Sequence, residues 1–241
     1  MSDFNIGFVI LPGITQLDFT GPYEVLSRLG TPASISVQSK FASSKVHVVA
    51  KSLSPVMSDR GLVVAPTCTF VDCTPLDLIC VPGGAGVVDA LGDAYTLEFI
   101  RRQGRRAQYV SSVCTGAFLI GAAGFLENRR ATTHWAQVSL LPLVGARHED
   151  ERVVRDGNVF TAAGVSSGID FAFHVVAELA GPEVARAIQL GIEYDPSPPF
   201  NAGHPSKVSE AAVALMRQRN EKAGEGIRRG LERVRLGNNE M

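Results

Sequence analysis

Cys114 stands where a strand-like stretch of the sequence changes into a helix-like one. Residues 111–124, SSVCTGAFLIGAAG, have β-type residues before the cysteine and small apolar residues after it. A sharp turn there would project the thiol at the carboxyl edge of a sheet, where open α/β folds bind ligands. The start of the helix would also lower the thiol pKa, and the thiolate is the nucleophilic form. This setting predicts a catalytic nucleophile, with a buried structural cysteine as the alternative.

The residues that follow the cysteine suit such a turn. Gly116 allows close packing, and the Thr115 hydroxyl stands at the predicted helix start. The arrangement is similar in shape to the nucleophile elbow of hydrolases, although the serine-hydrolase motif itself is absent. A cysteine hydrolase normally keeps a histidine near its thiol. His134, in ATTHWAQ, is interpreted instead as a helix cap or a core residue.

Asp18 is the acidic residue most suited to work with this thiol. It lies in TQLDFTGP, just beyond the first predicted strand. The carboxyl ends of neighbouring parallel strands meet at one edge, so Asp18 is expected over the same crevice as Cys114. Burial and a nearby thiolate would favour its protonated form, which could give a proton and later take one from water. The alternative is a helix N-cap, a task that Thr20 could also perform ahead of Pro22.

A glycine-rich segment, PGGAG at residues 82–86, follows another strand-like run. It lacks the Gly-Lys-Ser/Thr ending of a phosphate loop. Its N–H groups are expected to approach a substrate closely, because no side chain intrudes, or else to form a simple tight turn. Three further cysteines have spacings that fit no common zinc site and are predicted to be small buried residues; they are Cys68, Cys73 and Cys80. We expect neither a metal nor an organic cofactor.

The composition excludes several classes of protein. The chain has 241 residues, of which 45% are hydrophobic, enough for one sizeable core. Its 23 basic and 24 acidic residues leave a net charge of -1, so neither nucleic acid nor an anionic membrane is an expected partner. The start, MSDFNIGFVILPG, predicts a buried strand rather than a signal peptide. Without an apolar run of about 20 residues, we expect a soluble, cytoplasmic protein.

Buried strands and helices alternate along most of the chain, which predicts an α/β fold with a mostly parallel sheet and helices on both faces. A hairpin is expected around Asp156-Gly157. No linker divides the sequence, so residues 1–205 form one predicted domain, and 206–241 form a charged helical extension of it. The predicted strands span residues 5–11, 34–40, 45–52, 76–81 and 107–113. The predicted helices span residues 22–30, 85–93, 94–104, 168–181, 182–194 and the tail. A loop is predicted at residues 195–205.

Taken jointly, the motifs resemble the ThiJ/PfpI superfamily, and within it most closely the isocyanide hydratases. The resemblance extends from Ile6 to about Pro205, and single motifs are shared with the amidase-like domains of some transcription regulators. It implies a flavodoxin-like sandwich with a nucleophile elbow, and a homodimer. The motifs are QLDFTGPYEVL, ICVPGGAG, SSVCTGAFLIGAAGFL, RATTHWA, RVVRDGNVFTAAGVSSGIDF and IEYDPSPPFNAGHP.

The resemblance also implies roles for particular residues. Cys114 matches the family nucleophile, Asp18 the general acid/base, and Thr115 the threonine needed for activity. Gly84 falls in the loop beside the sulfur. Val165, in AAGVSSG, matches a backbone position next to the cysteine where the family often has isoleucine.

The implied activity is the hydration of an isocyanide to an N-substituted formamide through a thioimidate on the cysteine. Two alternatives stay open. Glyoxalases or deglycases of the same superfamily usually have a glutamate on the first helix, where Glu24 is available, and a histidine after or near the thiol, where this chain has Thr115. A ligand or redox sensor is the second alternative, because an exposed cysteine of low pKa oxidises readily. The tail is too short for the helix-turn-helix pair of the regulators.

Overall fold

The computed structural model describes residues 3–30 and 43–239 of the chain, and its centre is a seven-stranded sheet. The β10–β11 pair is antiparallel, and the other described pairs in this sheet are parallel. The predicted α/β class with a mostly parallel sheet is confirmed. In sheet order the strands are β10 (Val153–Asp156), β11 (Val159–Ala162), β7 (Tyr109–Val113), β6 (Leu78–Val81), β1 (Phe4–Val9), β2 (Ser44–Ala50) and β5 (Cys68–Thr69).

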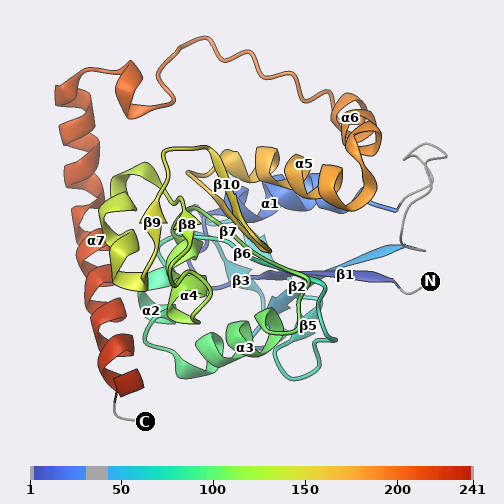
Figure 1. The fold of residues 1–241 in the computed structure, drawn as a ribbon, viewed down its shortest axis with the longest axis horizontal. Helices are drawn as coiled ribbons and strands as arrows, with labels where there is room; N and C mark the ends of the chain where they lie inside the picture. Colours follow the sequence, from blue (N-terminus) through green and yellow to red (C-terminus); the bar gives the residue numbers. More distant parts are fainter. Residues whose placement is uncertain (1–2, 31–42, 240–241) are drawn as a thin grey trace.

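Helices cover both faces of the sheet, as Figure 1 shows. One layer holds α1 (Gln16–Leu26), α5 (Ser167–Ala180) and α6 (Pro182–Gly191), which contact one another in that order. The other layer holds α2 (Val87–Ala90), α3 (Ala94–Gly104) and α4 (Ala117–Ala122), with α7 (Glu210–Asn239) along its side. The central strands β6 and β7 are therefore buried at every residue, which explains their continuous apolar or small-residue sequences.

Smaller elements complete the described part of the chain. Two short ribbons pair β3 (Val56–Met57) with β4 (Val63–Val64), and β8 (Arg130–Ala131) with β9 (Arg147–His148). The 3-10 segments are η1 (Cys114–Gly116), η2 (Trp135–Val144) and η3 (Pro205–Lys207). The predicted hairpin and the irregular loop before η3 are both present. The strand predicted at residues 34–40 lies outside the described residues.

The first helix begins at Gln16, six residues before the predicted start at Pro22. Thr20 is not a cap, because its hydroxyl donates a hydrogen bond to the carbonyl of Gln16 within the helix. Pro22 is tolerated inside α1 because it is buried, with its ring against Gly168 of α5. Packing between α1 and α5 thus outweighs the cost of an interior proline. As a consequence Asp18 lies in the first turn of a helix, not in a loop.

Other boundaries also differ from the predictions. The helix expected over residues 85–93 is only the four-residue α2, and the helix start expected at His134 opens the ten-residue 3-10 segment η2. Cys80 is fully buried as expected, whereas Cys68 and Cys73 are only partly buried. These two residues lie at the edge strand and in the turn after it, where one side of the sheet ends.

The C-terminal helix α7 joins the core through a narrow apolar stripe. Ile227 and Leu231 are buried against the main fold, while most of the helix surface is charged and exposed. The helix contacts η2, α2 and α4. None of the described helices is long and apolar enough to span a membrane. The division of the chain at residue 205 stays a prediction.

Replacing Ile227 by alanine measures how far α7 belongs to the main fold. The side chain is 2% exposed, so its removal should destabilise the protein by about 2–5 kcal/mol. Leu236→Ala on the same helix is the matched control, because this leucine is 66% exposed and should change stability by less than about 0.5 kcal/mol. Urea unfolding of both variants checks the difference. If both substitutions change the free energy of unfolding by the same small amount, α7 does not stabilise the core.

Candidate active site

Cys114 lies at the sharp turn between β7 and the following helical segment, with a backbone φ of 57°. Such a conformation is uncommon for a residue other than glycine and persists only where the surroundings hold it. Here the Cys114 N–H donates to the carbonyl of Ala163 at 2.8 Å, and its own carbonyl accepts from the Thr133 hydroxyl at 2.8 Å. The backbone is therefore fixed from both sides, and the thiol is held in one place.

The turn after the cysteine rests directly on the end of β6. A side chain at Gly116 would collide with the carbonyl oxygen of Val81, so glycine is required for this approach. The six-residue helix α4 starts immediately afterwards and is buried along its whole length. This contact places the end of β7, which carries Cys114, beside the loop that leaves β6.

Asp18 is fully buried in the first turn of α1, with its carboxyl group close to Cys114. Its Oδ2 accepts a hydrogen bond from the Gly83 N–H at 3.0 Å. Its Oδ1 makes no hydrogen bond to the described residues. Burial raises the pKa of Asp18 to about 7, and the hydrogen bonds that it receives only partly oppose the rise. The group is therefore present in both protonation states near neutral pH.

The loop after β6 holds the side chains of the site rather than presenting free donors. The Gly84 N–H donates to the Thr115 hydroxyl at 3.1 Å, and the Gly83 N–H is bound to Asp18. The expectation that these N–H groups would face a substrate is not met. Because the Thr115 oxygen accepts this bond, its own proton stays available for donation. A side chain at Gly84, where φ is 127°, would collide with the backbone of Gly13 and Thr15.

Opposing influences act on the pKa of the Cys114 thiol. Burial, followed by the charge of Asp18, raises its pKa, while the N–H groups of Thr115 and Val165 donate to the sulfur and oppose that rise. The net direction is upward, contrary to the expectation of a low pKa at a helix start. Because the thiol pKa is raised well above that of the carboxyl, the pair holds two protons and no charge below about pH 7, and one proton and one negative charge above it.

Val165 reaches the sulfur through its backbone. Its φ of 22° is unusual for a β-branched residue, and it turns the N–H toward Cys114. Val165 also lines a cavity of about 880 Å³ together with Thr133, His134 and Gly164. A substituent on a small ligand could occupy this volume next to the residues that fix the cysteine.

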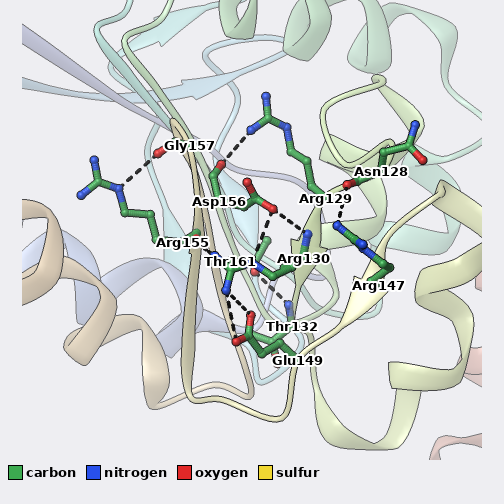
Figure 2. A network of polar contacts seen from close by, with 10 residues as sticks. All are labelled: Asn128, Arg129, Arg130, Thr132, Arg147, Glu149, Arg155, Asp156, Gly157 and Thr161. Atoms are coloured by element: carbon green, nitrogen blue, oxygen red, sulfur yellow. Dashed lines mark hydrogen bonds and ion pairs between the residues drawn. The ribbon is translucent and has the colours of Figure 1, made fainter.

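The segment that carries Thr133 is fixed by a polar network, shown in Figure 2. The Arg129 guanidinium donates to the Asp156 carbonyl at 2.7 Å, and the Arg130 N–H donates to the Asp156 carboxylate at 2.9 Å. The Thr132 N–H donates to the Thr161 hydroxyl at 2.9 Å. These bonds tie residues 129–132 to β10 and β11, so the Thr133 hydroxyl stays under the carbonyl of Cys114.

His134 and Glu24, the alternative candidates for the site, have other roles in the structure. His134 accepts from the Ala136 N–H at 3.3 Å at the start of η2, so the predicted capping role is confirmed. Burial lowers the pKa of this histidine. Glu24 is exposed on the outer side of α1 and forms an ion pair with Arg28. Among the described residues, no cluster of three or more histidine, cysteine or acidic side chains could hold a metal ion.

Gly83 and Thr133 bind the site residues directly, although their residue types do not predict it. Gly83 lies within PGGAG and Thr133 within RATTHWA, and these motifs indicate the segments but not the individual contacts. The order of residues gives no indication of which N–H or hydroxyl meets which partner. Those pairings follow from the packing of loops that are far apart in the sequence.

Comparison with known proteins gives consistent matches over most of the chain. The model of the DJ-1/PfpI family matches residues 5–178. An isonitrile hydratase from Pseudomonas putida is 50% identical over 215 residues, which are 89% of this chain and 89% of that protein. The structure of a ThiJ/PfpI family protein from Pseudomonas syringae superposes with a TM-score of 0.87 at 38% identity, covering 96% of this chain and 91% of that one. Drosophila melanogaster DJ-1beta, at 23% identity and a TM-score of 0.64 over 80% of this chain and 98% of that one, shares the fold.

Asp18→Asn tests whether the buried carboxyl has a raised pKa. The pKa of Asp18 is 3.8 in the unfolded chain and about 7 in the folded protein, so the folded protein binds this proton more tightly. The contribution of Asp18 to stability is therefore greatest below that value and falls as the pH rises through 7. Between about pH 5 and pH 8 the ionisation of Asp18 lowers the free energy of unfolding by on the order of 2 kcal/mol. Asp18→Asn, which removes the ionisation, should gain about this much relative to the wild type.

Urea unfolding of both proteins at the two pH values measures this change. Asp89→Asn is the matched control, since Asp89 is exposed on α2 and its loss should leave the pH dependence of the wild type intact. A stability difference between wild type and Asp18→Asn that is the same at both pH values would contradict the raised pKa.

Proposed function

The chain belongs to the DJ-1/PfpI family, and from this premise we propose that it hydrates isocyanides to N-substituted formamides. The observation that carries the proposal is the Asp18 carboxyl, buried beside the Cys114 thiol with a pKa of about 7. A group that titrates near the working pH can both give and accept a proton during one reaction. The Pseudomonas putida relative, at 50% identity, is an isonitrile hydratase, and isonitrile is another word for isocyanide.

In the first half of the proposed reaction, the Cys114 sulfur attacks the terminal carbon of the isocyanide. The thiolate forms when the shared proton resides on Asp18, and the N–H groups of Thr115 and Val165 then stabilise the sulfur. As the C–S bond forms, Asp18 gives its proton to the same carbon. The product is a thioimidate on Cys114, and Asp18 is left as a carboxylate.

In the second half, Asp18 activates a water molecule for attack on the thioimidate carbon. It takes a proton from the water and delivers it to the substrate nitrogen, which gives a tetrahedral adduct. The hydroxyl proton of that adduct then passes to Asp18 as the C–S bond breaks. The formamide leaves, and the pair returns to its starting state with one proton shared. The Thr115 hydroxyl, held by Gly84, is placed to orient the reacting groups.

The rival activities receive less support from the described residues. A glyoxalase or deglycase site would use a glutamate of the first helix, but Glu24 points outward and pairs with Arg28. A sensor would need a reactive exposed thiol, whereas Cys114 is 6% exposed and its pKa is raised by burial. A homodimer and a cytoplasmic location, both expected from sequence, belong to the proposal as well.

The purified chain should convert a simple alkyl isocyanide into the corresponding N-alkylformamide. Cys114→Ala and Cys114→Ser should lose this turnover while circular dichroism shows an unchanged fold, because the nucleophile is absent. Cys68→Ser, at the distant edge of the sheet, is the matched control and should keep its turnover. Near-normal activity of Cys114→Ala would remove the covalent mechanism. A folded wild type that forms no formamide would remove the proposed function.

Asp18→Asn should lower kcat by about 10²–10⁴-fold, because one group supplies both proton transfers. Asp18→Glu keeps the carboxyl but misplaces it, so it should retain more activity and should hydrolyse the thioimidate slowly. Rapid quenching and mass spectrometry of Asp18→Glu should then show the full substrate mass added to the peptide that contains Cys114. If Asp18→Asn keeps most of its kcat, the residue has a structural role only.

A further inference from the structure

Cys68 and Cys73 lie side by side at the edge of the sheet farthest from β10. Cys68 begins the edge strand β5, and a turn directly after that strand brings Cys73 back toward it. The Cys73 N–H donates to the Thr69 carbonyl at 3.0 Å, and the N–H groups of Val71 and Asp72 point to the Thr69 hydroxyl at 3.2 and 3.4 Å. The turn is thus built around Thr69, and the two thiols that flank it interact with each other.

These two thiols differ from the other cysteines in their access to solvent. Both are partly buried against the core, whereas Cys80 is fully buried and Cys114 is 6% exposed. Val71, in the turn between them, is 77% exposed, so a small reagent can approach from this side. Cys68 and Cys73 are therefore the most accessible thiols among the described residues.

The surroundings of Cys68 and Cys73 favour the protonated thiol at both residues, and they make one of the two the better nucleophile. Burial raises the pKa of both groups, and it raises that of Cys73 to about 12. The hydrogen bond between the two thiols lowers the pKa of Cys68 and raises that of Cys73, and a bond to Thr67 also lowers the pKa of Cys68. The Arg102 guanidinium opposes the rise at Cys73. Cys68 is accordingly the better first nucleophile, with Cys73 beside it to resolve the product.

We propose that Cys68 and Cys73 form a second thiol site, which a low-molecular-weight disulfide such as oxidised glutathione converts reversibly into an intramolecular disulfide. The Cys68 thiolate attacks one sulfur of the reagent, forms a mixed disulfide and releases one thiol, which takes the Cys68 proton. The Cys73 thiolate then attacks the Cys68 sulfur and releases the second thiol, which takes the Cys73 proton. Two protein thiols are oxidised and one disulfide reagent is reduced.

The position of this site separates it from the active site. Strands β2, β1 and β6 lie between β5 and the strand that carries Cys114. The turn is anchored by Phe70, which is fully buried and stacks on Phe99 with ring centroids 4.2 Å apart. The turn that carries the two thiols is therefore packed against helix α3. The thiol pair is independent of the proposed hydration of isocyanides.

The full chain, incubated with excess oxidised glutathione at about pH 8.5, tests the proposal. After unfolding and alkylation with N-ethylmaleimide, tryptic peptide 61–101 contains Cys68, Cys73 and Cys80, so Cys80 serves as an internal reference. We expect this peptide to carry one label, on Cys80, and to have a mass two hydrogen atoms below that of the reduced peptide with a single label. Dithiothreitol before alkylation should restore all three labels.

Cys73→Ser is the matched variant, because it keeps the attacking thiol and removes the resolving one. It should accumulate glutathione on Cys68 at least about tenfold above the wild-type level, since the intramolecular step is lost. The same treatment is applied to the wild type. If Cys68 and Cys73 of the wild type are then both still alkylated, while Cys68 of the Cys73→Ser variant is glutathionylated, the proposal is overturned. Separate glutathione adducts on the two wild-type thiols would overturn it as well.

Discussion

The close approach of the loop after β6 to two other segments is the constraint on which the site depends. An added Cβ at Gly83 would lie 2.6 Å from both the backbone nitrogen and the hydroxyl of Thr115, and 3.0 Å from the Asp18 carboxyl. Because glycine leaves this space free, the N–H of Gly83 binds Asp18 and the N–H of Gly84 binds Thr115 directly. Helix α1, the loop and the cysteine turn are thereby held in contact, and a larger residue would force them apart.

The same contact removes water from the carboxyl and the thiol. In water an aspartate and a cysteine titrate far apart, but here burial raises both pKa values and the two groups influence each other. The carboxyl therefore ionises first, and above about pH 7 the remaining proton rests on the thiol, from which Asp18 can accept it. The raised thiol pKa need not prevent attack, because a protonated Asp18 removes the repelling charge and leaves two N–H donors facing the sulfur. The cost is a loss of stability as the carboxyl ionises.

Much of the architecture follows from local sequence patterns. Continuous apolar runs predicted the central strands because a parallel sheet covered by helices buries both faces, and Asp156-Gly157 predicted the hairpin because its turn suits those residues. The prediction is wrong at α1, which begins at Gln16 and not at Pro22. Local propensity places proline in the first turn, but packing of Pro22 against Gly168 made an interior position stable.

Local patterns in the chain are enough to predict the fold class, the turn at Cys114 and the residue types from which a site could be made. Three features depend on how distant segments pack: the loop N–H groups bind Asp18 and Thr115, the thiol pKa rises instead of falling, and Cys68 lies beside Cys73. The difference lies in the range of the interactions. Periodicity and turn chemistry act over a few residues, whereas burial and hydrogen bonding join distant segments, such as Asp18 and Gly83, which are 65 positions apart.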